Sequence, residues 1–196
     1  MADLEKLRKN LEREGFVTSC FETGEEACAY LSQKLDQTTI GFGGSVTVQQ
    51  LGLYDKLATH NTCLWHWQSS DVLDASRTHA YICSLNGVSE NGELINIDGS
   101  GNRVASGLFG HQELYFVIGT NKIAPDFESA LWRARNIAAP KNAQRLGRNT
   151  PCAAKGDRCY NCDSPERICA ALTVYWRKPK AIPHVEVVIV NQDLGY

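Results

Sequence analysis

The sequence is organised around the stretch Ser84-Leu-Asn-Gly-Val-Ser-Glu-Asn-Gly-Glu-Leu-Ile-Asn-Ile-Asp-Gly-Ser-Gly-Asn-Arg103, which follows a short apolar run at residues 80–83. Glycine permits positive φ angles and close approach of the backbone, and Asn and Asp side chains form local hydrogen bonds in turns. Composition alone is equally typical of two hairpin turns at the surface. The neighbouring sequence instead favours a tightly turned backbone that presents polar side chains to a cleft.

Length and charge limit the classes of function. The 196 residues suit a single domain, residues 1–196. A formal charge of -2 and an isoelectric point near 6.2 argue against a nucleic-acid or membrane-surface partner, because either would require a basic stripe. No apolar run reaches the roughly 18 residues of a membrane span, and the first residues do not have the pattern of a signal peptide. We therefore expect a cytoplasmic protein.

Short apolar runs alternate with amphipathic segments along the chain. We expect strands at residues 16–21, 39–42, 61–67, 80–84 and 114–118, and helices at residues 4–14, 23–35, 48–57, 71–77 and 125–139. This alternation predicts an α/β fold with a layered, mostly parallel sheet flanked by helices. Two later apolar runs, at residues 172–176 and 185–190, are expected to extend the same sheet.

The turn Gly43-Gly-Ser-Val-Thr47 joins an expected strand to an expected helix. Such a turn can present backbone N–H groups to an anion, with the hydroxyls of Ser45 and Thr47 as further donors, although a plain strand-to-helix turn has the same pattern. Ligands of parallel sheets gather at the carboxyl ends of the strands. This turn, the Asn86 turn and Asn121-Lys122 are all expected there, so they predict one cleft.

A series of motifs in a fixed order resembles the lactate-utilisation (LUD) domain family. They are Gly43-Gly-Ser-Val-Thr47 with Leu51-Gly-Leu53, Asn86-Gly-Val-Ser-Glu-Asn-Gly92, Asn96-Ile-Asp-Gly-Ser-Gly-Asn-Arg103, Val117-Ile-Gly-Thr-Asn-Lys122, Ala139-Pro140, Arg145-Leu146 and Asp193-Leu-Gly-Tyr196. The resemblance covers nearly the whole chain and is to single-domain members, similar to lactate utilisation protein C. It implies the Rossmann-type layered fold of the sugar-phosphate isomerase and CoA-transferase superfamily.

The resemblance also implies where a ligand binds. In the superfamily the first glycine loop commonly holds a phosphate or acyl-CoA portion, and residues 43–47 correspond to it. Asn86 stands where some relatives have a catalytic carboxylate, which argues against isomerase chemistry there and leaves Glu90 and Asp98 as candidate acid–base residues. The residues expected to bind a small anionic ligand are Gly43, Gly44, Ser45, Thr47, Asn86, Asn96, Asn102, Arg103, Asn121 and Lys122.

Four of the eight cysteines are clustered in a Cys-rich insertion at about residues 151–170. Cys152, Cys159, Cys162 and Cys169 are spaced C-x6-C-x2-C-x6-C, and structural disulfides are not expected in a reducing cytosol. A C-x-x-C pair with two flanking thiolates predicts a tetrahedral four-cysteine metal site for zinc or a [4Fe–4S] cluster, which the spacing does not separate. A redox-active Cys159/Cys162 dithiol and plain buried thiols are the alternatives.

Two functions of different classes follow. The first is a site for an organic-acid, phosphorylated or acyl-carrying anion, in which Asn102 and Arg103 position the ligand and Glu90 or Asp98 moves a proton. The second is a non-catalytic regulatory or electron-transfer accessory protein whose centre is the cysteine cluster. Some LUD family members act in operons that oxidise L-lactate to pyruvate through iron–sulfur proteins, so such proteins are expected redox partners. The sequence leaves open whether any substrate is turned over.

Other polar residues have simpler interpretations. The five histidines form no metal-binding pair and are expected to be structural or at the surface. Trp65 and Trp67 fit a half-buried strand, and Arg145 fits a solvated helix face. A homodimer is the default expectation from the general frequency of dimers.

Overall fold

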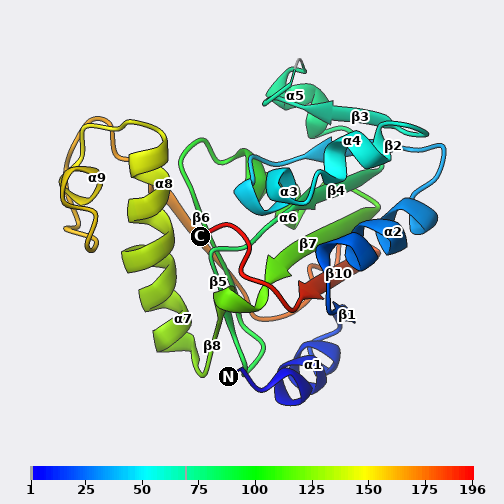
Figure 1. The fold of residues 1–196 in the computed structure, drawn as a ribbon, viewed down its shortest axis with the longest axis horizontal. Coiled ribbons are helices and arrows are strands. Elements are labelled where there is room, and N and C mark those ends of the chain that lie inside the picture. Colours follow the sequence, from blue (N-terminus) through cyan, green and yellow to red (C-terminus); the bar gives the residue numbers. More distant parts are fainter. Residues whose placement is uncertain (1, 69) are drawn as a thin grey trace.

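The computed structural model describes residues 2–68 and 70–196 and contains two β-sheets between helices (Figure 1). The larger sheet has six parallel strands in the order β1-β10-β7-β4-β2-β3. They are β1 (Val17–Phe21), β2 (Thr39–Phe42), β3 (Thr62–Trp65), β4 (Ala80–Cys83), β7 (Glu113–Gly119) and β10 (His184–Val190). The predicted α/β fold, a mostly parallel sheet flanked by helices, is confirmed.

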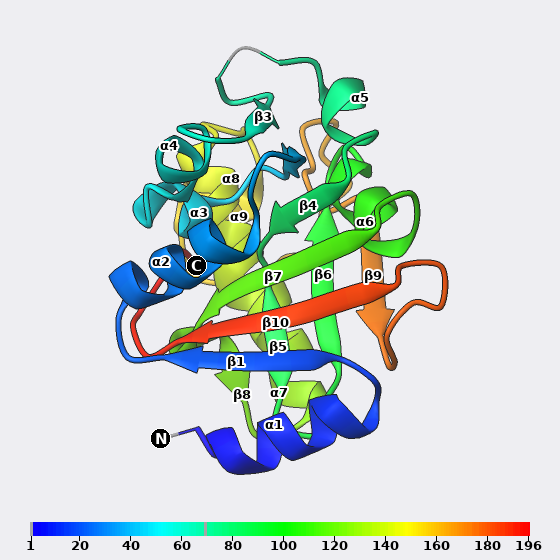
Figure 2. The ribbon, with the colours of Figure 1, turned by 90° about the vertical axis from the view of Figure 1, so that its right-hand side faces the viewer.

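The organising stretch folds into the second sheet. Its strands β5 (Gly87–Ser89) and β6 (Leu94–Asp98) form an antiparallel hairpin. The short strand β8 (Ile123–Ala124) pairs with β5, and β9 (Ala171–Tyr175) pairs with β6. Figure 2 shows these strands running behind and across those of the larger sheet. The hairpin carries β6 back toward the larger sheet, so that β6 and β4 both contact the helix at Asn102–Leu108.

Only one of the last two strands joins the larger sheet as expected. β9 belongs instead to the second sheet, where it pairs antiparallel with β6. β10 does lie in the larger sheet, but between β1 and β7 and not at an edge. Its near-continuous burial explains the position, because a strand that is apolar on both faces belongs in the middle of a parallel sheet.

The helices form the outer layers. Those on one face of the larger sheet are α2 (Gly24–Lys34), α3 (Val46–Gln50) and α4 (Leu53–Leu57). A long helical segment covers the outer face of the second sheet: α7 (Phe127–Arg133), the π-helical turn η2 (Ala134–Ala138) and α8 (Ala139–Arg145) (Figure 1). The remaining helices are α1 (Leu4–Arg13), α5 (Val72–Ala75), α6 (Asn102–Leu108), the 3-10 turn η1 (Thr120–Lys122) and α9 (Pro151–Lys155).

Three apolar clusters hold these layers together. One lies between α2–α4 and the larger sheet, and includes Leu31, Phe42 and Val188. A second fills the space between the two sheets and takes in Leu7 and Leu11 of α1. The third joins α7 and η2 to the second sheet. Burial of such apolar surface is the dominant favourable term in folding.

Local sequence explains where several elements begin. Asp3 caps α1 by accepting from the Lys6 N–H at 2.9 Å, and Thr23 with Glu26 forms a reciprocal capping box at α2. Gly87 lets α7 approach β5, because a Cβ there would lie 2.4 Å from the carbonyl oxygen of Ala130. In the part of the chain that the structure describes, no helix combines the length and apolar character needed to cross a bilayer.

Candidate functional site

A cavity of about 280 Å³ lies at the carboxyl ends of β2, β4 and β7, next to the end of β6 and the start of α8. This is the edge at which ligands of parallel sheets bind. The polar side chains that line it are Ser45, Thr47, His66, Ser84, Asn86, Asp98, Ser100, Asn102, Arg103, Lys122, Asn142, Arg145, Arg148 and Tyr196. The three turns predicted to form one cleft, at Gly44, Asn86 and Lys122, do meet there.

Most of the predicted site residues line this cavity and some do not. Those that line it are Gly44, Ser45, Thr47, Asn86, Asp98, Asn102, Arg103 and Lys122. Four others do not line it: Gly43, Glu90, Asn96 and Asn121. Each of the four has a structural contact or a buried position that accounts for its location.

Lys122 is the most buried cation of the site, with 4% of its surface exposed. Its Nζ donates to the hydroxyls of Thr47 and Ser84, both at 2.8 Å, and to the carbonyl oxygen of Leu85 at 3.0 Å. Burial lowers the pKa of the amine to about 7, and the guanidinium groups of Arg133 and Arg103 act in the same direction. Near neutral pH the amine therefore exists in both its charged and its neutral form.

Asp98 uses its carboxylate to organise the loop that leads into α6. One oxygen accepts from the Gly99 N–H at 2.8 Å, and the other accepts from the N–H groups of Arg103 and Val104 at 2.9 and 3.2 Å. The Arg103 guanidinium lies 3.8 Å from Asp98 and donates to the carbonyl oxygen of Ile97 at 2.7 Å. The expected acid–base group is therefore a carboxylate that binds the first backbone N–H groups of α6, and the Arg103 guanidinium is held mainly by the carbonyl oxygen of Ile97.

The glycine turn shapes the cavity wall, and its first N–H is not free for a ligand. The Gly43 N–H donates to the carbonyl oxygen of Ile82 at 3.0 Å. A Cβ at Gly43 would lie 2.8 Å from Cγ of Arg103, and one at Gly44 would lie 3.1 Å from the Trp67 ring. Ser45 accepts from the Val48 N–H at 3.2 Å and so caps α3. The two glycines thus allow the Arg103 and Trp67 side chains to pack against the turn.

Two arginines at the cavity were missed as site residues. Arg145 at the end of α8 donates to Oδ1 of Asn142 at 2.9 and 3.0 Å, and its guanidinium carbon lies 4.9 Å from the centre of the Trp67 ring. Arg148 lies three residues further on and also lines the cavity. The Asn142/Arg145 spacing of one helical turn was the available signal, but exposed arginines on a helix are usually solvated.

His66 also lines the cavity, although the sequence predicts a structural or surface role for it. Its Nδ1 is buried and has no hydrogen-bond partner among the described residues. Burial lowers the pKa of His66, and Arg103 lowers it further, although Asp98 acts in the opposite direction. The ring is therefore neutral near pH 7.

A buried arginine joins the segments behind the cavity. Arg133 of α7 donates to the carbonyl oxygens of Asn121 at 2.8 Å, Asn86 at 2.7 Å and Tyr196 at 3.1 Å. The Asn121 side chain accepts from the Leu194 N–H at 3.1 Å, and Asn86 Oδ1 accepts from the Ile97 N–H at 2.7 Å. Asn86 and Asn121 therefore hold backbone in place.

Glu90 and Asn96 lie away from the cavity. The Glu90 carboxylate accepts from the Asp3 N–H at 2.9 Å and lies 3.5 Å from the Lys6 amine, so it joins the β5–β6 hairpin to α1. This position gives Glu90 no access to a ligand in the cavity. Asn96 is fully buried in β6, and its side-chain nitrogen and oxygen have no hydrogen-bond partner among the described residues.

The Cys-rich segment consists of α9 followed by residues 156–170 without regular structure. Its four cysteines are free and partly exposed. Within residues 2–68 and 70–196, no three His, Cys, Asp or Glu side chains form a group that could hold a metal ion. The thiols as arranged therefore do not fit zinc or an iron–sulfur cluster, and the four-cysteine metal site stays a prediction from spacing.

Two other features of this segment are relevant. The Arg167 guanidinium donates to the carbonyl oxygens of Cys162 at 2.8 Å and Cys169 at 3.0 Å. A second cavity of about 320 Å³ is lined by Cys159, Cys169, Arg135 and Arg167 among others. This cavity shares Ile97 and Ala139 with the first one, so Cys159 and Cys169 line a cavity that adjoins the main one.

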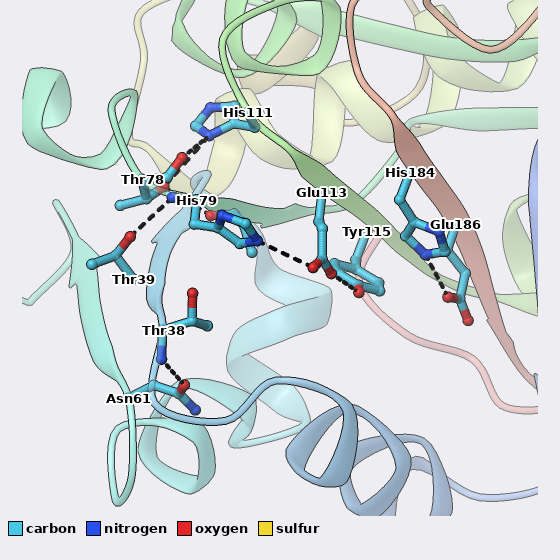
Figure 3. A network of polar contacts seen from close by, with 11 residues as sticks. Thr38, Thr39, Asn61, Thr78, His79, His111, Glu113, Tyr115, His184 and Glu186 are labelled. Atoms are coloured by element: carbon cyan, nitrogen blue, oxygen red, sulfur yellow. Dashed lines mark hydrogen bonds and ion pairs between the residues drawn. The ribbon is translucent and has the colours of Figure 1, made fainter.

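A separate polar network lies at the amino ends of strands of the larger sheet, away from the cavity (Figure 3). There the His79 ring lies 3.2 Å from the Glu113 carboxylate, and the His184 ring lies 3.0 Å from that of Glu186. Lys34 lies 2.6 Å from the same Glu186. These side chains contact one another at the strand ends, which is consistent with the predicted structural role of these histidines.

Comparison with known proteins gives one family and one fold. The family model of the LUD domain matches residues 4–190. The chain is similar to the crystal structure of a DUF162 family protein from Deinococcus radiodurans, with a TM-score of 0.56 and 11% identity over 95% of each chain. At that identity the likeness shows a shared fold. No curated protein matches the sequence.

Proposed function

The chain belongs to the LUD domain family, and on that premise we propose that it binds a small organic acid anion in the cavity at the strand ends. The family is linked to lactate utilisation in general. A short 2-hydroxy or 2-oxo carboxylate, such as lactate or pyruvate, is therefore the ligand class that we favour.

The observation that carries this proposal is the excess of positive charge around the cavity. Arg103, Lys122, Arg145 and Arg148 line it, and Asp98 is the one side-chain carboxylate among the described residues that do so. Both oxygens of Asp98 already accept backbone N–H groups. An anion that enters the cavity therefore meets three arginines whose charge one carboxylate only partly balances, and arginine pairs well with carboxylates through two parallel hydrogen bonds.

The size of the cavity favours a small ligand. Pockets for drug-sized molecules usually have volumes of roughly 300–1,000 Å³, and this cavity has about 280 Å³. A short organic acid fits that volume, and a complete acyl-CoA would have to leave most of its atoms outside. The phosphorylated and acyl-carrying ligands suggested by the resemblance are therefore less favoured.

Two side chains in the cavity are suited to moving a proton. Lys122 has a pKa lowered to about 7, and His66 is neutral with a buried Nδ1 that lacks a partner among the described residues. General acid–base catalysis works best when the pKa lies near the operating pH. Any proton transfer at this site is therefore assigned to Lys122 or His66, and neither Glu90 nor Asp98 is proposed for it.

Titration calorimetry with L-lactate, pyruvate and inorganic phosphate tests the proposal. We expect saturable binding of a carboxylate that weakens by about tenfold in Arg145→Ala, because a charge-assisted hydrogen bond is lost. Arg135→Ala is the matched control, since Arg135 is an exposed arginine of the same helical segment that does not line this cavity. Equal affinities in the two variants, or no binding of any of the three anions, would contradict the proposal.

We propose as a second candidate that the Cys-rich segment is a redox or metal-binding centre of an accessory protein. The shared wall residues Ile97 and Ala139 support it, because they put the cysteine side of the segment next to the ligand cavity. Because the thiols as arranged do not form a metal-binding group, metal binding would require residues 156–170 to rearrange.

Protein purified without oxygen tests this second candidate. Elemental analysis and an absorption spectrum of the wild type are compared with those of Cys159→Ser and of Cys20→Ser, a cysteine outside the segment. Iron or zinc that is lost only in Cys159→Ser supports the candidate. Metal-free protein whose thiols also show no reversible oxidation would eliminate it.

A further inference from the structure

We propose that Lys122 is an amine nucleophile that forms an imine with the carbonyl carbon of a 2-oxo acid bound in the cavity. The inference rests on the proposed function, because it needs a carboxylate anion at the same site. It goes further by naming the reacting carbonyl group and the residue that attacks it.

The surroundings of Lys122 are unusual for a buried lysine. Among the residues that the structure describes, no carboxylate lies within ion-pair distance of its Nζ. Its three partners, the hydroxyls of Thr47 and Ser84 and the carbonyl oxygen of Leu85, are neutral. A buried charge is normally paired, so a permanently charged ammonium is poorly supported at this position.

The same three partners suit a neutral amine. An ammonium group can donate to all three oxygens. A neutral amine can donate to Leu85 and Thr47, while the Ser84 hydroxyl turns to donate to the nitrogen lone pair, because a hydroxyl is both donor and acceptor. The Thr47 hydroxyl has an acceptor of its own in the carbonyl oxygen of Leu194 at 3.3 Å. The network therefore satisfies the amine in both protonation states. The Ser84 hydroxyl accepts from the ammonium form and donates to the neutral amine.

The charged groups near the amine favour its neutral form. Arg133 of α7 and Arg103 of α6 are both cationic, and Cys83 of β4 is a neutral thiol because burial raises its pKa to about 12. With its pKa lowered to about 7, Lys122 has about a thousandfold more neutral amine at neutral pH than an ordinary lysine. Desolvation and a neighbouring cation are the known means of activating a lysine for attack on a carbonyl.

The proposed step balances as follows. The neutral Nζ of Lys122 adds to the carbonyl carbon, and the carbonyl oxygen takes up a proton to give a carbinolamine. Loss of the nitrogen proton and of that oxygen as water leaves the C=N bond. The ligand carboxylate faces Arg103 and Arg145, which line the same cavity, and Ser84 or the neutral His66 carries the protons. Formation of the imine requires neither oxidant nor reductant.

Reductive trapping tests the inference. Wild-type protein is incubated with pyruvate near neutral pH, treated with sodium borohydride, and analysed by intact mass and peptide mapping. The expected result is one reduced pyruvate adduct on the peptide that contains Lys122. Its yield should rise as the pH passes through 7 and level off above 8, whereas an ordinary lysine would continue to gain reactivity up to about pH 10. L-lactate, which has a hydroxyl in place of the ketone group, should give no adduct and should compete with pyruvate.

Variants and binding data separate the outcomes. Lys122→Met should lose the adduct, and Lys141→Met, which changes an exposed lysine of α8, should keep it. Peptide mapping of the wild type decides the question even if Lys122→Met does not fold. Pyruvate that binds by calorimetry without forming an adduct, or an adduct on another lysine, would overturn the inference and leave the proposed function intact. Absence of pyruvate binding would overturn the inference, and only if L-lactate and phosphate also fail to bind would the proposed function be overturned with it.

Discussion

The amine of Lys122 lies 2.8 Å from the hydroxyl oxygen of Thr47, although the two residues are 75 positions apart in the chain. The contact joins the turn after β7 to the helix that follows β2, and so it closes the floor of the cavity. Thr47 and Lys122 are 1% and 4% exposed, which makes the bond sensitive to the loss of either partner.

Thr47→Val should lower the free energy of unfolding by about 1–3 kcal/mol, because the buried amine loses one of its three acceptors. The loss should be larger at pH 6 than at pH 9, since only the ammonium form needs all three acceptors. Urea denaturation at the two pH values measures it. Thr47→Ser keeps the hydroxyl and is the matched control. A loss that does not depend on pH would show that only packing changed.

Lys122 should make the protein more stable as the pH rises above 7. The amine has a pKa of about 7 in the folded chain and an ordinary value of 10.5, so between these values the unfolded state binds more protons and the free energy of unfolding increases with pH. The slope from this one group is at most about 1.4 kcal/mol per pH unit. The difference between wild type and Lys122→Met, measured from pH 7 to 10, isolates it. Parallel curves for the two proteins would contradict the lowered pKa.

Asp98→Asn should separate the structural role of this residue from an acid–base role. The unfolding free energy should fall by about 1 kcal/mol, because a neutral amide accepts the backbone N–H groups of Gly99, Arg103 and Val104 less strongly than the carboxylate does. Affinity for a carboxylate ligand should rise a few-fold, since the negative side chain at the cavity is neutralised. Glu90→Gln should leave the affinity unchanged. Weaker binding in Asp98→Asn, in a protein shown to be folded by circular dichroism, would contradict this assignment.

Much of the fold could be predicted from sequence because parallel strands are short, apolar and separated by helices. The strand at residues 39–42 and the alternation around it are confirmed. The second sheet was missed because β5 and β6 lie within a Gly- and Asn-rich stretch that resembles turns. Tertiary packing, in this case the approach of α7 over Gly87, overrides that local preference.

The cavity itself could be predicted more readily than its chemistry. Polar turns after parallel strands share one edge by topology, so Ser45, Thr47 and Lys122 were identified. Composition does not say whether a carboxylate faces a ligand or a backbone N–H, and this is why Asp98 was given an acid–base role. Arg145 is held at the cavity by a contact with Trp67, a residue far from it in the sequence, and no spacing in the sequence indicates that contact.

Gly43→Ala should destabilise the protein by about 1–3 kcal/mol and also weaken ligand binding. A methyl group there would lie 2.8 Å from Cγ of Arg103 and 2.9 Å from Cβ of Cys83, so β4 or the Arg103 side chain must move. Gly52→Ala is the control, because it strains a residue with φ of 61° without a close contact. That variant should lose stability and keep its ligand affinity, as measured by thermal unfolding and calorimetry. Equal ligand affinities in the two variants would show that Arg103 is not displaced.

Trp67→Leu should weaken the binding of a carboxylate ligand through its effect on Arg145. The Trp67 ring stacks on Trp65 with 5.2 Å between ring centres, and the Arg145 guanidinium carbon lies 4.9 Å from the Trp67 ring centre. The cation–π contact stabilises the position of the Arg145 guanidinium by about 0.5–1 kcal/mol, the range for exposed sites. Its loss corresponds to a few-fold loss of affinity.

A double-mutant cycle tests whether Trp67 acts through Arg145. If it does, Trp67→Leu should have little further effect in an Arg145→Ala background, because the contact is already absent. Additive losses in the double variant would mean that Trp67 contacts the ligand directly. Arg145 would then be oriented mainly by Asn142, whose Oδ1 accepts from it at 2.9 and 3.0 Å.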